Sequence, residues 1–332
     1  MMELFPVEYG RDLIERHRER FDDAVVVTQP EVWPAVETRI GPATPRHVEI
    51  AHDLTPGGLE RLVDELPEAP IVGVGGGVAM DVAKWVHWRR QTPLTQVPGL
   101  PSVNACFTRM TAIRDGGIVR YDGGAVPDLV LVDFELMRTA PIAMIRAGIG
   151  DVLSCHTARF DWELAVAAGN DPAWDEEAAA ASLRYISNLA EAAPAIHDAT
   201  DEGIEALMEL HREIGWRCHD LGHARFEEGS EHFFAYCFEE VTGRTILHGE
   251  IVSLGVIAMS LAQDNRPQHP LDIIRAAGTR HRLDDLGLTW DEVETTLRRL
   301  PAFAQEGRYW DSIAQRFAVT DDLLDNLRQA VS

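Results

Sequence analysis

Three residues with metal-binding side chains stand beside expected helix starts between residues 150 and 250. Asp151 follows a glycine, His232 ends the segment Gly-Ser-Glu-His, and His248 begins the segment His-Gly-Glu. One carboxylate and two imidazoles supply three protein ligands and leave a coordination position open, as a catalytic divalent metal requires. The spacing of 16 between the two histidines allows one short helix to separate them. A second interpretation stays open, because the chain has 13 histidines, and such residues more often lie on the surface or in satisfied core positions.

Other histidines offer competing sites. His219 and His223 have the i, i+4 spacing of a zinc-protease helix, but an aspartate stands where that helix needs a glutamate base, and Gly222 weakens the helix. His156 lies about one turn after Asp151, so it either lines the same site or lies on the surface of its helix.

A run of glycines forms a candidate phosphate-binding loop. Gly75, Gly76 and Gly77 follow an apolar run and precede a helical pattern, so their backbone amides could approach a phosphate at a helix N-terminus. A tight turn that needs positive φ would also select glycine. Asp81 and Lys84 lie three residues apart on the same face of this helix, and Lys84 is the only lysine among 30 basic residues. Because lysine and arginine are not chemically interchangeable, this single ammonium is a candidate functional group.

The elements that must position these groups change in character near residue 140. Before it, short β-branched runs alternate with helical patterns, which predicts a mostly parallel sheet covered on both faces. The expected strands are Ala24–Thr28, His47–Ala51, Ile71–Val74, Leu94–Val97 and Leu129–Val132. After it the chain is expected to be helical, over Ile142–Ala168, Pro172–Ala192, Asp201–His219, Ser230–Val241, Gly249–Ala262 and Pro270–His281.

Local capping signals support two further helices. Thr55 and Pro56 are typical of a helix start, and Thr289 with Glu292 forms a capping box. The change in character near residue 140 predicts two domains. We expect an α/β, Rossmann-like dinucleotide-binding domain over residues 1–140 and an all-helical domain over residues 141–332, which holds metal and substrate.

Composition excludes several classes of protein. The 332 residues carry a formal net charge of −24, which repels phosphate backbones and anionic lipid, so nucleic acid and membrane surfaces are poor partners. The longest apolar run, around Ile251–Ala262, is shorter than the ~20 residues of a membrane helix. The N-terminus has no signal-peptide core, and four widely spaced cysteines indicate free thiols in the cytoplasm.

Five segments in order resemble the metal-dependent polyol dehydrogenase superfamily. They are GGGVAMDVAK (75–84), VPGLPSVNACFT (97–108), AGIGDVLSCHTARFDWELA (147–165), EEGSEHFF (227–234) and ILHGE (246–250). The superfamily includes glycerol dehydrogenases, iron-containing alcohol dehydrogenases, glycerol-1-phosphate dehydrogenases and dehydroquinate synthases. The last three segments look most like glycerol-1-phosphate dehydrogenases. The resemblance spans roughly residues 20–265 and implies a dehydroquinate synthase-like, two-domain fold.

The resemblance also implies roles for individual residues. It makes Asp151, His232 and His248 the ligands of one divalent metal, usually Zn²⁺ and in some members Fe²⁺ or Ni²⁺. It places NAD or NADP on a second set of residues: Gly75, Gly76, Gly77, Asp81 and Thr108. The remaining candidates, which we expect at the catalytic centre, are Asn104, His156 and Lys84.

Three positions depart from the superfamily pattern. Gly99 removes a hydroxyl that faces the cofactor in relatives, and Asn104 replaces an aspartate that faces the substrate. The neutral amide at 104 makes the pocket more tolerant of an anionic substrate, or less active. The segment 28–30 (Thr-Gln-Pro) has no aspartate for the adenine ribose, which leaves the choice between NAD and NADP open.

These features predict reversible hydride transfer between a nicotinamide and a small polyol or polyol phosphate, with glycerol 1-phosphate/dihydroxyacetone phosphate as the favoured pair. A bound metal would act as a Lewis acid on the alcohol oxygen. Two alternatives remain: a sugar-phosphate cyclase, a lyase that uses NAD only transiently, and a non-catalytic relative. Net accumulation of NADH would separate a dehydrogenase from a cyclase. A homo-oligomer, dimer or higher, is also expected.

Overall fold

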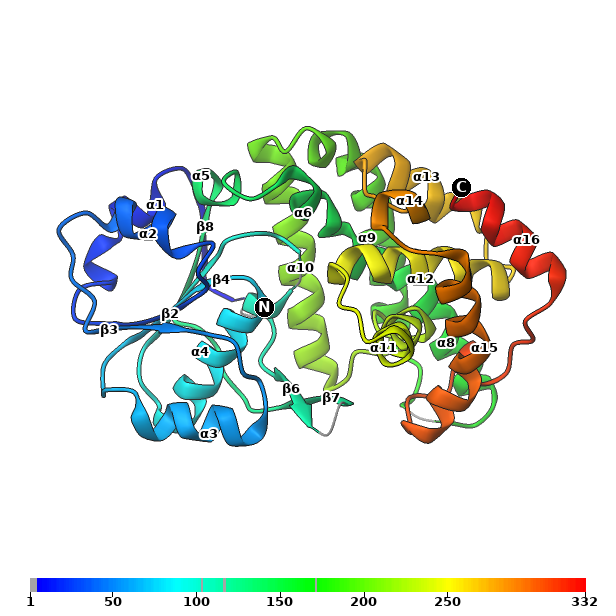
Figure 1. The fold of residues 1–332 in the computed structure, drawn as a ribbon, viewed down its shortest axis with the longest axis horizontal. Coiled ribbons are helices and arrows are strands. Elements are labelled where there is room, and N and C mark those ends of the chain that lie inside the picture. The colour runs from blue at the N-terminus through cyan, green and yellow to red at the C-terminus, as the bar shows by residue number, and fades with distance from the viewer. Residues whose placement is uncertain (1–4, 103, 116–117, 171) are drawn as a thin grey trace. The chain divides into compact units, whose positions relative to one another are not determined.

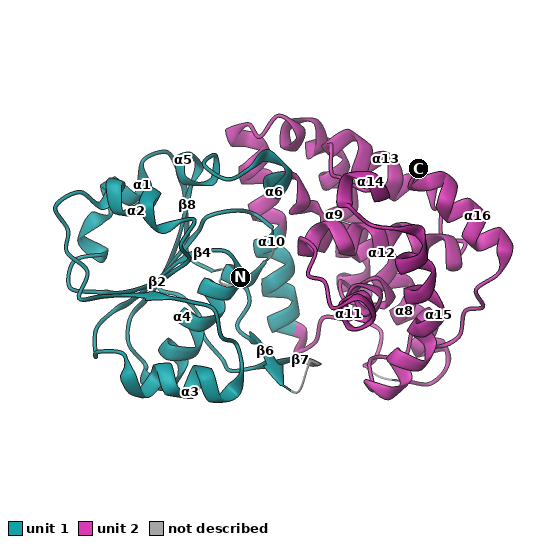
Figure 2. Ribbon diagram, in the orientation of Figure 1, with its two compact units in different colours: residues 1–145, 211–220 teal, residues 146–210, 221–332 magenta. Residues whose placement is uncertain are grey.

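The computed structural model describes residues 5–102, 104–115, 118–170 and 172–332 (Figure 1). The chain divides into two compact units, coloured separately in Figure 2. Unit 1 comprises Met1–Ile145 with His211–Asp220, and unit 2 comprises Arg146–Leu210 with Leu221–Ser332. Helix α10 (Asp201–Leu221) therefore contributes residues to both units. The expected domain boundary near residue 140 stays a prediction.

A six-stranded sheet forms the centre of unit 1. Its strand order is β1-β8-β5-β4-β2-β3, and every neighbouring pair is parallel. The strands are β1 (Val7–Gly10), β2 (Val25–Thr28), β3 (His47–Ile50), β4 (Ile71–Gly75), β5 (Leu94–Pro98) and β8 (Leu129–Asp133). The predicted α/β domain with a parallel sheet is confirmed. Strand β1 and the antiparallel pair β6 (Thr111–Asp115) and β7 (Ile118–Asp122) were not predicted.

Helices cover both faces of this sheet. Figure 1 shows α1 and α2 on one side and α3 and α4 on the other. The helices up to residue 137 are α1 (Leu13–Arg16), α2 (Trp33–Ile40), α3 (Pro56–Glu65), α4 (Gly77–Arg90) and α5 (Phe134–Met137), with short 3₁₀ turns η1 (Arg18–Arg20) and η2 (Ala105–Phe107). The predicted cap of α3 is confirmed, because the Thr55 side chain accepts the Gly58 N–H.

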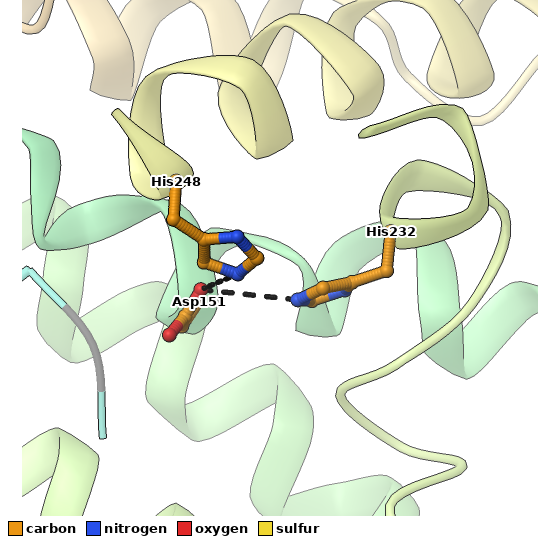
Figure 3. Close-up of side chains that lie close together, drawn as sticks. All are labelled: Asp151, His232 and His248. Carbon is orange, nitrogen blue, oxygen red and sulfur yellow. Dashed lines mark ion pairs between the residues drawn. The ribbon is translucent and has the colours of Figure 1, made fainter. Parts of the chain in front are cut away.

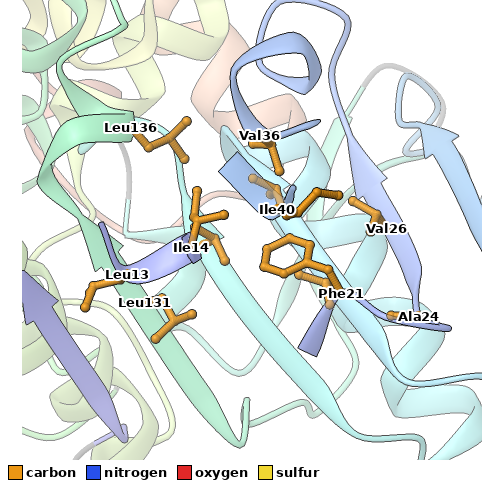
Figure 4. Packing of buried hydrophobic residues seen from close by; sticks show 12 residues of the cluster. Leu13, Ile14, Phe21, Ala24, Val26, Val36, Ile40, Leu131 and Leu136 are labelled. Atoms are coloured by element: carbon orange, nitrogen blue, oxygen red, sulfur yellow. The ribbon is translucent and has the colours of Figure 1, made fainter. Parts of the chain in front are cut away.

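The core on the α1 and α2 side is built from alternate strand residues (Figure 4). Val26 of β2 and Leu131 of β8 pack there with Ile14, Phe21 and others of the helical layer, all of them at most 2% exposed. On the opposite face, a Cβ at Gly73 would lie 2.7 Å from the Ala83 side chain. Helix α4 thus packs closely on β4, and this contact fixes the position of α4 relative to the strand.

From Phe134 onward the described residues form only helices and connecting segments. The helices are α6 (Ile142–Ala147), α7 (Ile149–Leu153), α8 (Cys155–Ala167), α9 (Glu176–His197), α10, α11 (Ser230–Thr242), α12 (His248–Ala262), α13 (Gln268–Ala277), α14 (Leu283–Leu286), α15 (Trp290–Glu306) and α16 (Asp321–Ala330), with a 3₁₀ turn η3 (Ile313–Gln315). The predicted helical region and the capping box of Thr289 with Glu292 are confirmed.

The single helix expected over Ile142–Ala168 is wrong in one respect, because the structure divides it into α6, α7 and α8. Gly148 precedes α7, and the Ser154 hydroxyl between α7 and α8 donates to the Asp151 carbonyl at 2.7 Å. Glycine and a back-bonding serine both weaken a continuous helix. Among the described residues, no helix combines the length and apolar character needed to cross a membrane.

Candidate metal centre and dinucleotide loop

Three helices of unit 2 bring Asp151, His232 and His248 together (Figure 3). Asp151 lies in α7, His232 in the first turn of α11, and His248 is the first residue of α12. Oδ1 of Asp151 is 3.2 Å from Nε2 of His248 and 3.8 Å from Nε2 of His232. Each residue offers one ligand atom, and these atoms lie within 4.8 Å of one another. In the part of the chain that the structure describes, no other set of three His, Cys, Asp or Glu residues meets this condition.

Glycines next to the candidate ligands allow the three helices to approach. A Cβ at Gly249, beside His248, would lie 1.9 Å from the Ala147 carbonyl oxygen. A Cβ at Gly150, beside Asp151, would lie 2.4 Å from the Gly249 carbonyl oxygen. Real Cβ atoms do not approach backbone this closely. A larger residue at 249 would push α12 away from the end of α6, and one at 150 would push α7 away from α12.

The electrostatics of this cluster favour a positive charge at its centre. Burial alone would raise the pKa of Asp151, but the neighbouring imidazoles of His248 and His232 outweigh burial and hold its pKa below the ordinary value. Burial alone would lower the pKa of His232, yet the Asp151 and Glu231 carboxylates raise it well above its ordinary value. The carboxylates thus stabilise a cation here, whether a proton or a metal ion.

A divalent metal fits this donor set. Oδ1 of Asp151 is buried and forms ion pairs with Nε2 of His248 and of His232, but no described group donates a hydrogen bond of good geometry to it. A buried carboxylate oxygen without a well-formed hydrogen bond costs free energy. A cation shared with the two imidazoles would satisfy it. Two nitrogens and one oxygen suit Zn²⁺ and also allow Fe²⁺ or Ni²⁺.

The glycine run of unit 1 lies at the N-terminus of α4. Gly75 ends β4 with φ of +138°, a conformation that favours glycine. The Gly76 N–H donates to Oε1 of Gln29 at 2.7 Å, so this amide already points at an oxygen acceptor. A Cβ at Gly75 would lie 2.7 Å from the same Gln29 oxygen. An amide that already binds an oxygen acceptor, a helix N-terminus and the lack of side chains fit a phosphate oxygen of a dinucleotide.

Lys84 is fully buried, and each of its three donors has an acceptor. Its Nζ lies 2.8 Å from Oδ1 of Asp81, 2.9 Å from Oγ1 of Thr108 and 2.6 Å from the Met110 carbonyl oxygen. An ammonium has three hydrogens, so none remains for a substrate. This geometry supports a positioning role, in which the hydrogen bonds and the ion pair of Lys84 connect α4 to the segment before β6. Asp81 and Thr108, which were predicted to contact the cofactor, are two of the residues that Lys84 contacts.

The structure does not bring His156 to the metal cluster. Its Nε2 lies 2.7 Å from the carbonyl oxygen of Asn265, which follows the C-terminal end of α12. His248 begins the same helix, whose 15 residues span about 22 Å. The remaining catalytic candidate, Asn104, lies in unit 1, where its carbonyl accepts the Phe107 N–H at 2.7 Å.

Among the described residues, the competing pair His219 and His223 belongs to no group of three metal-binding side chains. Nη1 of Arg109 lies 3.2 Å from Nδ1 of His219, and Nδ1 of His223 accepts the Arg225 N–H at 3.3 Å.

Sequence reasoning missed two residues that contact the sites. Gln29 contacts the glycine loop, and Glu231 contacts His232. Gln29 belongs to the segment 28–30 at the end of a predicted strand, and Glu231 belongs to the Gly-Ser-Glu-His segment, but neither residue was assigned a role from the sequence. Adjacency to a predicted ligand was the available signal for Glu231.

Comparisons with known proteins agree with the resemblance stated from the motifs. Residues 7–141 match the family model described as iron-containing alcohol dehydrogenase. The chain is 27% identical to a glycerol-1-phosphate dehydrogenase [NAD(P)+] of Hyperthermus butylicus over 93% of this chain and 92% of that protein. It is 26% identical to the enzyme of the same name from Thermoplasma volcanium, over 90% of this chain and 89% of the relative. The resemblance to metal-dependent polyol dehydrogenases is thereby confirmed.

A solved structure shares the fold. The glycerol dehydrogenase of Schizosaccharomyces pombe superposes with a TM-score of 0.68 at 18% identity, covering 98% of this chain and 89% of the other. The predicted fold class, an α/β domain followed by a helical region, is confirmed.

Proposed function

We propose that this chain, a homologue of glycerol-1-phosphate dehydrogenases, is a metal- and NAD(P)-dependent oxidoreductase that interconverts a secondary alcohol and a ketone on a small polyol or polyol phosphate. The observation that carries the proposal is the cluster of Asp151, His232 and His248, in which a buried carboxylate oxygen faces two imidazole nitrogens. The names of the curated relatives favour glycerol 1-phosphate and dihydroxyacetone phosphate as the substrate pair. A homo-oligomer and a cytoplasmic location stay predictions.

The residues of the chain divide the work of such a reaction. Asp151, His232 and His248 would hold a divalent metal, which polarises the alcohol oxygen as a Lewis acid. The N–H groups of Gly76 and Gly77 at the start of α4 would hold the dinucleotide diphosphate, while the nicotinamide carries the hydride. The choice between NAD and NADP is open, because Gln29, at the end of β2, is uncharged.

The test measures metal content and turnover on the same samples. Wild type, His232→Ala and His248→Ala are purified without chelator, with His281→Ala as a matched control, because His281 contacts the Thr279 carbonyl rather than the cluster. Elemental analysis should find near-stoichiometric Zn, Fe or Ni in wild type and control and none in the two cluster variants. Oxidation of NADH and NADPH with dihydroxyacetone phosphate or dihydroxyacetone should fall by about 10³-fold or more, above ~4 kcal/mol.

Different outcomes separate the alternatives. Metal that is retained in both cluster variants would contradict the ligand assignment. Metal binding without net oxidation of either nicotinamide would favour the cyclase. An activity on dihydroxyacetone but not on its phosphate would change the substrate while leaving the reaction class intact.

A further inference from the structure

Glu231 is a buried carboxylate that contacts the candidate metal ligand His232 on the side of the ring away from Asp151. Its Oε1 lies 2.9 Å from Nδ1 of His232, the ring nitrogen opposite the one that faces Asp151. The Glu231 side chain is fully buried and that of His232 is 6% exposed, whereas His248 is 35% exposed. The two candidate imidazole ligands therefore differ, since the buried one has a carboxylate on its second nitrogen.

Two further donors hold Glu231 in place. Its Oε1 accepts the Gly229 N–H at 2.7 Å, and its Oε2 lies 2.7 Å from the Thr157 hydroxyl of α8. A Cβ at Gly255 of α12 would lie 2.5 Å from the Glu231 carbonyl oxygen, so the backbone of Glu231 is packed directly against that helix. Contacts from α8 and α12 thus fix both the backbone and the carboxylate.

The acceptor role of this carboxylate determines the tautomer of His232. Because Glu231 accepts from a backbone amide and a hydroxyl, it also accepts from Nδ1, which must then carry the hydrogen. Nε2, on the side of Asp151, is then the ring nitrogen at which a cation binds. A carboxylate on the second ring nitrogen fixes the ring orientation and raises the basicity of a metal-binding histidine.

We propose that Glu231 is a positioning residue for the metal centre, which orients His232 and strengthens its bond to a divalent cation; this rests on the proposed metal-dependent function. A simpler role is open to the same side chain, because the contact with the Gly229 N–H also caps α11. Capping needs only one neutral acceptor oxygen, which a glutamine provides. Orientation by charge needs the carboxylate, so Glu231→Gln separates the two roles.

The experiment compares Glu231→Gln with Glu250→Gln. Glu250 is equally buried and lies two residues from His248, but it pairs with Arg280 at 2.6 and 2.8 Å and has no role in the proposal. The Zn²⁺ dissociation constant is measured by competition with a chelator, and the visible absorption spectrum is recorded after Co²⁺ substitution. Glu231→Gln should weaken Zn²⁺ binding by about 10- to 100-fold and shift the Co²⁺ bands. Glu250→Gln should change neither, even if it lowers the stability of the fold.

A second pair of variants tests the same proposal in case Glu231→Gln does not fold. Thr157→Val removes the hydroxyl that holds Oε2, and Thr157→Ser retains it. The valine variant should weaken Zn²⁺ binding, and the serine variant should restore it. Equal Zn²⁺ affinity and Co²⁺ spectra in wild type and Glu231→Gln, or equal losses in both glutamine variants, would overturn the positioning role while the metal site stands. Absence of metal binding by wild type would instead overturn the proposed function itself.

Discussion

The partners of a buried charged group decide what it can do in this molecule. Lys84 and Asp151 are both buried, but Lys84 has an acceptor for every hydrogen of its ammonium, whereas Oδ1 of Asp151 faces two imidazole nitrogens and receives no well-formed hydrogen bond from a described group. The ammonium of Lys84 therefore stabilises the fold and has no hydrogen left to donate to a substrate. The aspartate is left able to bind a cation, and we assign the chemistry to it on that basis.

His156 gives a prediction about pH. Burial, reinforced by Arg266, His269 and Arg159, lowers the pKa of His156 from 6.5 to about 4. Because the folded state binds the proton less readily than the unfolded state, this residue lowers the free energy of unfolding as the pH falls from 6.5 to 4. The shift corresponds to a loss of about 3 kcal/mol. In His156→Gln, whose amide can still donate to the Asn265 carbonyl, this loss should be absent.

The measurement is urea unfolding of wild type and His156→Gln at several pH values in this range. The difference between the two proteins is the informative quantity, because titrations common to both cancel. Parallel pH profiles would show that His156 keeps an ordinary pKa. They would also remove the evidence that it is buried as a neutral imidazole.

At the scale of elements, close contact between helices creates the metal centre. Helices α7, α11 and α12 each contribute one candidate ligand, and a glycine beside or facing each contact removes the side chain that would separate them. Gly150 acts between α7 and α12, Gly249 between α12 and the end of α6, and Gly255 between α12 and α11. The site therefore depends on helix packing as much as on the ligands.

Gly249→Ala tests this dependence. A Cβ there would meet the backbone oxygen of Ala147 at 1.9 Å, and backbone cannot move aside as a flexible side chain can. We expect the free energy of unfolding to fall by about 1–3 kcal/mol or more. Metal content should fall with it, as measured by denaturation and elemental analysis.

Gly57→Ala is the matched control, since it also adds one methyl group to a helical glycine. A Cβ at Gly57 of α3 has no atom within 4 Å, so this change should be neutral or stabilising by at most about 1 kcal/mol. If Gly249→Ala behaves like Gly57→Ala, the helices have room to adjust, and their close packing does not determine the site.

The net charge of the whole chain gives a prediction about salt. At −24, the folded protein repels itself, and ion pairs such as Arg46–Asp23 and Arg120–Asp115, which oppose this repulsion, are exposed. Raising the ionic strength from about 0.01 M to about 0.15 M shortens the screening length from ~30 to ~8 Å. We expect the thermal midpoint to rise over this range. A fall would show that the surface ion pairs contribute more than the repulsion does.

Local signals predicted much of the fold. The predicted strands Ala24–Thr28 and Ile71–Val74 correspond to β2 (Val25–Thr28) and β4 (Ile71–Gly75). They are recognisable because a strand that is buried on both faces is a short, continuous apolar run. Caps at Thr55 and Thr289 predicted helix starts correctly, since a cap involves residues only three positions apart. Strand β1 escaped prediction because its four residues are only half-buried and mix polar with apolar types.

The sequence by itself determined the types of the elements, the class of fold and the residues able to bind a metal, because these depend on near neighbours and side-chain chemistry. Tertiary structure decided which of those residues meet. It brought Asp151, His232 and His248 together across three helices, placed His156 at the opposite end of α12, and enclosed Lys84 among acceptors. Contacts between residues that are distant in the chain follow from how helices pack, and helix packing depends on the whole unit rather than on any segment alone.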